Sequence, residues 1–580
     1  MYILVLLVGL ICAGACVQHR SYMKPIPISK ALEKNNTRAS VYSNMLYAEY
    51  IMEFGDLEAA ETHFSRAAAQ SGQVDPWLSL ADIQMKRCKT AEAETSLKKA
   101  MSIDMSAWYG WLLQSGIETR HHRWQAVADA LQTAASLSPE DPYVWYLLAE
   151  QEFMLHGPEA AAEVVVGAME ANPDNESLVR FLLRLAILTN NRVLLEGSLE
   201  TLRMMSVDSF TMLINTVVEE GIKPPAKELR GVFKSQLYTT NPLPGEQLAW
   251  AGLLLRWDET TEALAVLQKL YEYDPGDYYA SYLIMQVLIR YADTGTIVTW
   301  EQAHHKDDRA TLYNTILLAE HLYEQGQYDD MLKLLDKLQP QRPGIERDIA
   351  RLKTKALLKL GKPQKAEAVI KGCLCNATDV PARLLWIWFL SKTGRTEELK
   401  QRITAMLEKE PDNYALLFEA IGYAYDADES PWVMAALQQM TERYRTRGAM
   451  LNFYGYALAE RGENLDEALC LLSEAYTQNH TAAVRDSLAW ALFKQGECAM
   501  AERMLYLAVE RWPEETEIMW HLAQVRMALN MNTDDIMTSV APEKTDDMSR
   551  VSRTSLNAYY HDPATFKATL PVCRTMEQTP

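Results

Sequence analysis

The chain of 580 residues is too long for one ordinary core, so several domains or a repeat array are expected. Hydrophobic residues make up 48% and charged residues 23%, which excludes wholesale disorder and a protein with many membrane spans, and only 25 glycines and 23 prolines argue against a turn-rich β architecture. The formal net charge of −20 argues against nucleic-acid binding, and eight cysteines are too few for a disulfide framework. Composition predicts a soluble helical protein.

The first segment, residues 1–16, contains an apolar run over residues 2–15. A run of this length fits a secretory signal better than a bilayer span, which needs about 20 residues. It ends in Ala13-Gly14-Ala15-Cys16, which resembles the lipobox of bacterial lipoproteins, whose cysteine is lipidated and becomes the mature N-terminus. We therefore expect lipidation of Cys16. A plain secretion signal and an uncleaved short anchor are the alternatives.

The residue after Cys16 is Val17 rather than aspartate. In enterobacterial lipoproteins this favours sorting to the outer membrane, so the resemblance implies a lipid anchor on the periplasmic side of that membrane. A periplasmic or secreted protein is the alternative location. Residues 17–40 carry prolines and asparagines without a helical period, and they are predicted to be a tether.

Small residues recur at a fixed distance over residues 41–205. Each unit contains two segments whose apolar residues recur with the period of an α-helix, and a turn separates the two segments. The recurring small residues lie within these segments. The pattern resembles the tetratricopeptide repeat, a helix–turn–helix unit of 34 residues, and implies an all-α, right-handed α-solenoid of stacked hairpins. Three series keep intervals of 33, 34 and 34 residues: Ala48, Ala81, Ser115, Ala149; Ala60, Ala93, Val127, Ala161; and Ala67, Ala100, Ala134, Ala168.

The repeat is interrupted once and then resumes. Residues 206–243, which contain Pro224-Pro225, lack the pattern and are predicted to be a spacer or degenerate hairpins. Residues 244–530 form a second predicted array, whose capping helix at 518–529 would shield the last apolar face. Residues 531–580 are polar and aperiodic, and they are predicted to be a disordered tail.

Motifs of enzymes and metal sites do not stand out in the sequence. It has no GxxxxGK[ST] loop, no GxSxG and no HExxH. Pairs such as His121-His122, and His304-His305 with Asp307-Asp308, are more simply interpreted as solvated turns than as metal ligands. Cys498 is predicted to be a small buried residue within a repeat. We therefore expect no catalytic residue, no metal and no cofactor.

Acidic residues follow the small residue of four predicted first helices, which line the concave face in this family. They are Glu49, Asp82, Glu150 and Glu320, with Glu53 and Glu324 one turn further, and with Met52, Met85, Phe153 and Tyr323 beside them. Carboxylates interleaved with apolar side chains predict a groove for a basic or amphipathic protein segment. A solvated acidic face is the alternative.

The repeat is an interaction scaffold used in unrelated processes, so the resemblance does not name a pathway. We expect a non-enzymatic scaffold, similar to bacterial repeat lipoproteins, that binds another protein or peptide for assembly of an envelope, export or secretion complex. The alternative is a regulatory or adaptor subunit of an envelope enzyme complex, such as a glycosyltransferase or protease. An enzyme with a site hidden in residues 206–243 or 277–308 is a third hypothesis.

Overall fold

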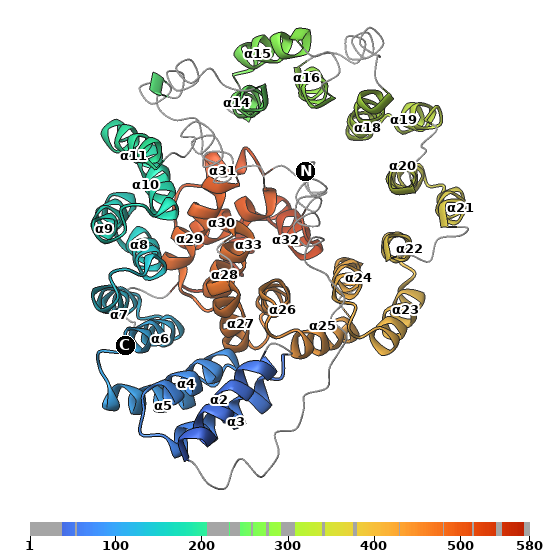
Figure 1. The fold of residues 1–580 in the computed structure, drawn as a ribbon. Helices are drawn as coiled ribbons and strands as arrows, with labels where there is room; N and C mark the ends of the chain where they lie inside the picture. The colour runs from blue at the N-terminus through green and yellow to red at the C-terminus, as the bar shows by residue number, and fades with distance from the viewer. Residues whose placement is uncertain are drawn as a thin grey trace. The chain divides into compact units, whose positions relative to one another are not determined.

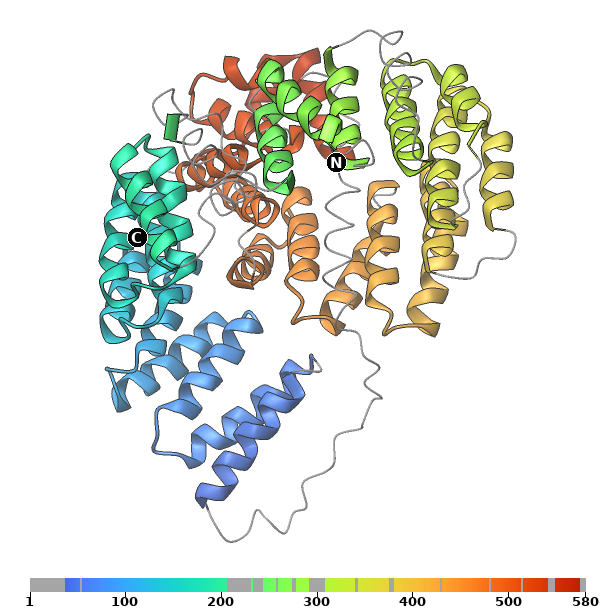
Figure 2. The same ribbon diagram turned by 45° about the horizontal axis from the view of Figure 1, so that its top comes forward.

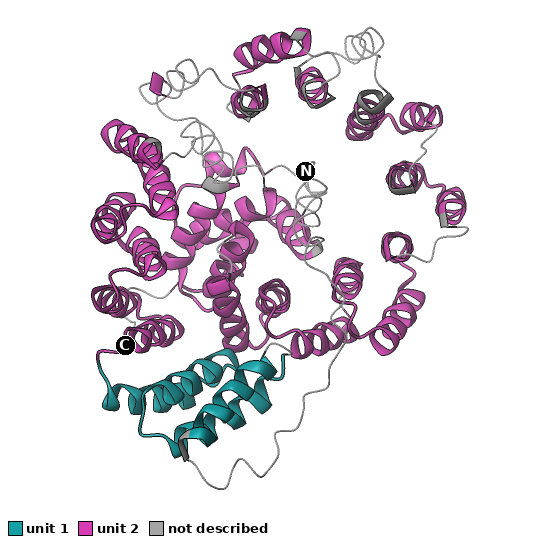
Figure 3. Ribbon diagram, viewed as in Figure 1, with its two compact units in different colours: residues 1–105 teal, residues 106–580 magenta. Residues whose placement is uncertain are grey.

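All regular elements that the structure describes are helices, and neighbouring helices pack as hairpins (Figure 1, Figure 2). The structure is a computed structural model, and it divides into two compact units, residues 1–105 and residues 106–580 (Figure 3). The predicted all-α solenoid of stacked hairpins is confirmed. The described residues are 37–52, 55–205, 231–232, 244–256, 259–273, 278–291, 308–338, 343–374, 380–427, 430–478, 481–512, 515–540 and 548–573.

The first unit contains two hairpins. Between the first two helices Gly55 adopts a φ of 81°, which L side chains rarely adopt, and Asp56 then caps the next helix by accepting a hydrogen bond from the Ala59 amide at 3.0 Å. Ala48 and Ala60 are fully buried in one apolar cluster, so the small residues stand where paired helices approach closely. The helices are α2 (Thr37–Met52), α3 (Leu57–Gln70), α4 (Asp75–Lys86) and α5 (Thr90–Ile103).

The second unit begins with three hairpins. Ala149 and Ala161 are fully buried in the cluster that α8 and α9 share with α10, as the recurrence predicts for small residues. The helices are α6 (Trp108–Arg120), α7 (Trp124–Leu137), α8 (Pro142–His156), α9 (Pro158–Ala171), α10 (Glu176–Leu188) and α11 (Arg192–Met204).

Hairpins continue beyond residue 243. Gly455 packs so closely on the following helix that a Cβ atom there would lie 2.7 Å from Leu472 Cγ. The helices are α14 (Pro244–Arg256), α15 (Thr260–Tyr273), α16 (Tyr278–Tyr291), α18 (Asp308–Glu324), α19 (Tyr328–Leu335), α20 (Pro343–Lys359), α21 (Pro363–Leu374), α22 (Val380–Lys392), α23 (Thr396–Lys409), α24 (Tyr414–Ala427), α25 (Pro431–Arg443), α26 (Gly448–Arg461), α27 (Leu465–Gln478), α28 (Ala482–Lys494), α29 (Cys498–Arg511) and α30 (Thr516–Ala528).

Several predicted segments lie outside the described residues. They include the signal segment with Cys16, the tether up to residue 36, and the spacer 206–243 except for residues 231–232. The candidate ligands His304, His305 and Asp307 also lie outside them.

The prediction of a disordered tail is wrong for residues 534–540 and 548–573. This segment forms α31 (Asp534–Met537), α32 (Arg550–His561) and α33 (Pro563–Ala568). Leu556 is fully buried, and the Phe566 ring lies 5.5 Å from the ring of Trp520 on α30. A few well-spaced apolar residues therefore cover the last hairpin, although the average composition of the segment is polar.

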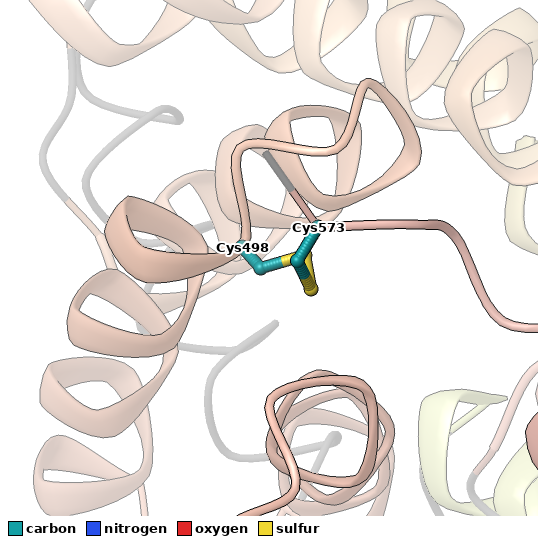
Figure 4. Close-up of a disulfide and its surroundings, with 2 residues drawn as sticks. All are labelled: Cys498 and Cys573. Atoms are coloured by element: carbon teal, nitrogen blue, oxygen red, sulfur yellow. A yellow bond between two sulfur atoms is a disulfide. The ribbon is translucent and has the colours of Figure 1, made fainter. Parts of the chain in front are cut away.

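A disulfide joins the end of this segment to the array. Cys573 is bonded to Cys498 at the start of α29, 75 residues earlier, with a Cα–Cα distance of 5.4 Å (Figure 4). Cys498 is fully buried, as predicted, and the disulfide gives it a covalent role that the prediction did not include.

Candidate interaction surface

In the first unit, the predicted site residues have different surroundings. Glu49 on α2 is exposed, whereas Asp82 on α4 forms an ion pair with Lys86 at 2.8 Å. Met52 packs at the edge of the apolar cluster of this unit, and Met85 is buried. Glu53 lies outside the described residues. An i,i+4 pair of this kind contributes little to stability, so Asp82 can exchange Lys86 for another cation.

Glu150 on α8 does not lie on an open surface, because it is enclosed by three partners. Arg485 Nη2 on α28 lies 2.9 Å from Glu150 Oε1, and the two side chains are 3% and 7% exposed. The Tyr476 hydroxyl on α27 donates to Glu150 Oε2 at 2.9 Å, and the Tyr146 hydroxyl donates to Oε1 at 3.0 Å. The predicted basic partner of Glu150 is therefore an arginine of the same chain.

The charges in this group are well defined. Burial alone lowers the pKa of Arg485, but Tyr476 and Glu150 outweigh burial and raise it, so the guanidinium stays protonated. Burial, reinforced by Glu150, raises the pKa of Tyr146 and leaves its hydroxyl neutral. Phe153 on the next turn of α8 packs against the core of the C-terminal repeats, and the Arg184 guanidinium carbon lies 6.0 Å from its ring centroid.

The third predicted group lies on α18. Glu320 is partly buried, and burial raises its pKa although Lys355 and Arg351 act in the opposite direction. Tyr323 lies beneath Lys355, whose Nζ is 5.9 Å from the ring centroid, and Glu324 is exposed. Lys355 and Arg351 of α20 therefore lie close enough to Glu320 of α18 to act on its charge.

The basic character of α20 and α21 is a feature that the acidic total charge conceals. Residues 343–374 contain eight Lys and Arg but three Asp and Glu, which gives a local charge of +5 in a chain of −20. Lys355 follows Thr354, a fully buried small residue of α20, just as Glu320 follows Ala319 in α18. The repeat register could have shown that a lysine in α20 occupies the position that a glutamate occupies in α18, but the prediction considered only the acidic positions.

A buried polar cluster in the C-terminal repeats was also not predicted. His521 on α30 lies at its centre, with Nδ1 2.8 Å from Asp486 Oδ1 on α28 and Nε2 3.4 Å from Ser552 Oγ on α32. The Ser552 hydroxyl donates to Glu517 at 2.9 Å, and the Tyr456 hydroxyl donates to the same oxygen at 2.9 Å. We call these five residues the His521 cluster.

The His521 cluster contains the residue types of a catalytic triad, but it does not have the properties that nucleophilic catalysis requires. Burial alone lowers the pKa of His521, yet Asp486 and the neighbouring glutamates outweigh burial and raise it to about 9. The imidazolium cannot accept a proton from Ser552, whose hydroxyl already donates to Glu517. His521 is fully buried, so the cluster fastens α32 to α28 and α30.

The described part of the chain has neither a membrane-spanning helix nor a metal-binding cluster. It contains no helix that is both long and apolar enough to cross a bilayer. Nor does it contain a group of three or more His, Cys, Asp or Glu side chains arranged to hold a metal ion. His122, once a candidate ligand, has its Nε2 3.0 Å from Gln495 Oε1.

No family model matches the chain. Over 199 residues it is 29% identical to a TPR repeat-containing protein of Pseudomonas aeruginosa, and the match covers 34% of this chain and 34% of that protein. The chain thus matches only about a third of the length of this relative.

Two solved structures are similar at low scores. One, from a functional characterization of Pseudomonas aeruginosa pilF, is 13% identical, with 43% of this chain and 100% of that chain covered and a TM-score of 0.28. The other, the APC/C hetero-tetramer Cut9–Hcn1, is 14% identical, with 89% and 95% covered and the same TM-score of 0.28. Scores this low support no conclusion about function. The recurrence of small residues and their burial within stacked helical hairpins agree with the predicted tetratricopeptide-type repeat, and the sequence relative is named for the same repeat.

Proposed function

We propose that this repeat scaffold is exported and holds a protein partner in the cell envelope, during assembly of an envelope, export or secretion complex. The observation that carries the proposal is the disulfide between Cys498 and Cys573. Disulfides persist in oxidising compartments such as the bacterial periplasm, and they are rare in the reducing cytosol. The apolar run that ends at Cys16 provides the matching export signal.

The compartment is tested by trapping thiols in the native host. Cells are quenched in acid, free thiols are alkylated, and peptides that contain Cys498 and Cys573 are analysed by mass spectrometry before and after reduction. We expect both cysteines to resist alkylation until they are reduced. If both are alkylated in unreduced samples, the protein resides in a reducing compartment and the export proposal is wrong.

The anchor is tested by palmitate labelling in the native host. We expect Cys16→Ser to abolish incorporation and to release the protein from the outer-membrane fraction. Cys12→Ser is the matched control, because it removes another cysteine of the same apolar segment and leaves the lipidation position intact. Equal labelling of the Cys16→Ser and wild-type proteins would show that Cys16 is not the lipidated residue.

The proposed partner is a basic or amphipathic segment, and the first unit offers the acids that it would contact. Glu49 is exposed, and Asp82 is paired with its helical neighbour Lys86. Attraction between exposed charges is screened over about 8 Å at physiological ionic strength, so binding should weaken as salt is added. Glu150 belongs to the second unit and is paired with Arg485 in this structure, so it is not counted among the acids of this surface.

The partner surface is tested by crosslinking in intact envelopes, followed by identification of captured proteins. Glu49→Gln combined with Asp82→Asn should reduce capture of the principal partner and its sensitivity to salt. The control combines Glu58→Gln with Glu92→Gln, two exposed acids on the second helices α3 and α5. If both double variants capture the same partner at the same salt tolerance, the acidic positions of α2 and α4 are only solvated surface.

A further inference from the structure

Helices α27, α28 and α29 lie against α6–α8, and α8 carries two of the predicted binding residues, Glu150 and Phe153. Arg485 pairs with Glu150, as described above, and the Tyr143 hydroxyl donates to the Thr477 carbonyl at 3.4 Å. Arg503 Nη1 donates to the carbonyls of Met154 and Leu155, at 2.6 and 2.7 Å, in the last turn of α8. We call this set of interactions the closure contact.

The closure contact is polar and ionic at its centre. Removing Glu150 and Arg485 from water costs free energy that their attraction only partly recovers, so a buried pair selects which surfaces meet more than it stabilises them. Arg503 satisfies carbonyls at the end of α8 that have no partner within the helix. Apolar packing across the contact comes from Met154, a buried member of the cluster of the C-terminal repeats, and from Trp124, Phe153 and Leu155, which pack against that cluster.

Buried apolar clusters lie on both sides of the closure contact, and the cluster of the C-terminal repeats also includes Met154 of α8. Leu131 and Leu148 belong to a cluster formed by α7 and α8, whereas Leu472 and Leu505 belong to the cluster of the C-terminal repeats. In a repeat array, stability comes mainly from packing between neighbouring units. Both sides therefore keep most of their stabilising contacts if the closure contact separates, and polar contacts between parts of a chain commonly permit such motion.

We propose that the closure contact is a reversible autoinhibitory contact, in which α27–α29 occupy α6–α8 as an internal ligand. Arg485 takes the place of an arginine from a partner helix, and Tyr476 completes the coordination of Glu150. Opening exposes Glu150 and Phe153 together, an acid beside an aromatic ring, to a helix that carries arginine and apolar residues. The proposal rests on the proposed function in one respect, that the covered surface of α8 binds a protein partner. Opening of the closure contact can itself be measured without any partner.

Opening can be measured in the full-length protein by photocrosslinking. The photoreactive residue p-benzoylphenylalanine replaces Tyr143, which is 42% exposed and adjacent to Thr477, and products joining residue 143 to α27 are quantified by mass spectrometry. Removing one member of a buried ion pair leaves the other charge buried without its partner, which favours the open state over the closed one. Glu150→Gln should therefore lower the yield of the crosslink between residue 143 and α27 at least about tenfold. The charge-exchanged variant, Glu150→Arg with Arg485→Glu, should recover much of it.

A matched control distinguishes the contact from ion pairs in general. Glu502→Gln removes a partly buried pair with Arg526, 2.9 Å apart, that lies between α29 and α30 and outside the closure contact. It should leave the crosslinked product unchanged. Circular dichroism and thermal melting of every variant report whether the helices remain folded.

Reversibility is tested in the wild-type background with a competitor. A synthetic peptide of residues 481–495 is added at about 1 mM, comparable to the effective concentration of a tethered segment. It should lower the crosslinked product, and the same peptide with Arg485→Gln should not. Three results would overturn the proposal: unchanged crosslinking in folded Glu150→Gln protein, unfolding of that variant, or equal effects of the two peptides.

Discussion

Cleavage of the Cys498–Cys573 bond should free the C-terminal helices from the array. Cys573→Ser removes the link without touching the core, because Cys573 is only partly buried while Cys498 is fully buried. For the 75-residue loop that the bond closes, the chain-entropy model gives an upper limit of about 4.5 kcal/mol. Measured losses of native disulfides are commonly about 2–5 kcal/mol. We expect the free energy of opening of α32 to fall by at least about 2 kcal/mol. This corresponds to amide hydrogen exchange about thirtyfold faster.

Hydrogen exchange followed by mass spectrometry measures this opening on peptides from α32 and α33. Cys498→Ser and the double variant should accelerate exchange in these helices to a similar extent, because each breaks the same bond. Val572→Ser is the control, since it changes the adjacent side chain, which is 89% exposed, and keeps the disulfide. If Cys573→Ser exchanges at the wild-type rate while mass spectrometry shows the wild-type bond intact, packing alone holds these helices and the reasoning fails.

Three further substitutions or conditions test other parts of the structure. The pKa of His521 is raised to about 9 from an ordinary value near 6.5, so its stabilising contribution is full below about pH 6.5 and is lost as the pH rises through 9. The melting temperature of the protein should therefore fall between about pH 6.5 and 9. It should fall less in the His521→Gln variant. Ala149→Trp should destabilise the array by about 1–3 kcal/mol or more in chemical denaturation, because Ala149 is fully buried where helices meet, whereas Val166→Trp at an exposed position should not. Phe566→Ala should cost about 3–5 kcal/mol by removing cover from Trp520, and a red shift of tryptophan emission should accompany it.

The hairpins could be predicted from the sequence because their packing is local. Residues such as Ala149 and Ala161 recur at the repeat interval and are fully buried where neighbouring helices meet. The recurrence depends on contacts within a hairpin and with the next one, and these are the contacts that a solenoid repeats. Nothing distant in the chain is needed to place them.

Distant contacts could not be predicted in this way. Arg485 is 335 residues from Glu150, and periodicity contains no information on which two units meet across that separation. The tail was mispredicted because average polarity hides single anchors such as Leu556 and Phe566, which are buried against the preceding repeats. The link between Cys498 and Cys573 likewise joins residues whose spacing follows no repeat.

The register of a repeat fixes the position of a side chain but not its environment. The residue after the small residue of a first helix is exposed at Glu49, buried at Glu150 and accompanied by cations at Glu320. In α20 the corresponding residue is Lys355, within a segment of charge +5. Within the second unit, a basic ligand of Glu150 and Glu320 would therefore meet a buried ion pair at the first residue and cations of α20 at the second. A segment that bound at α18–α20 would need both signs of charge, opposite Glu324 and Lys355 in turn.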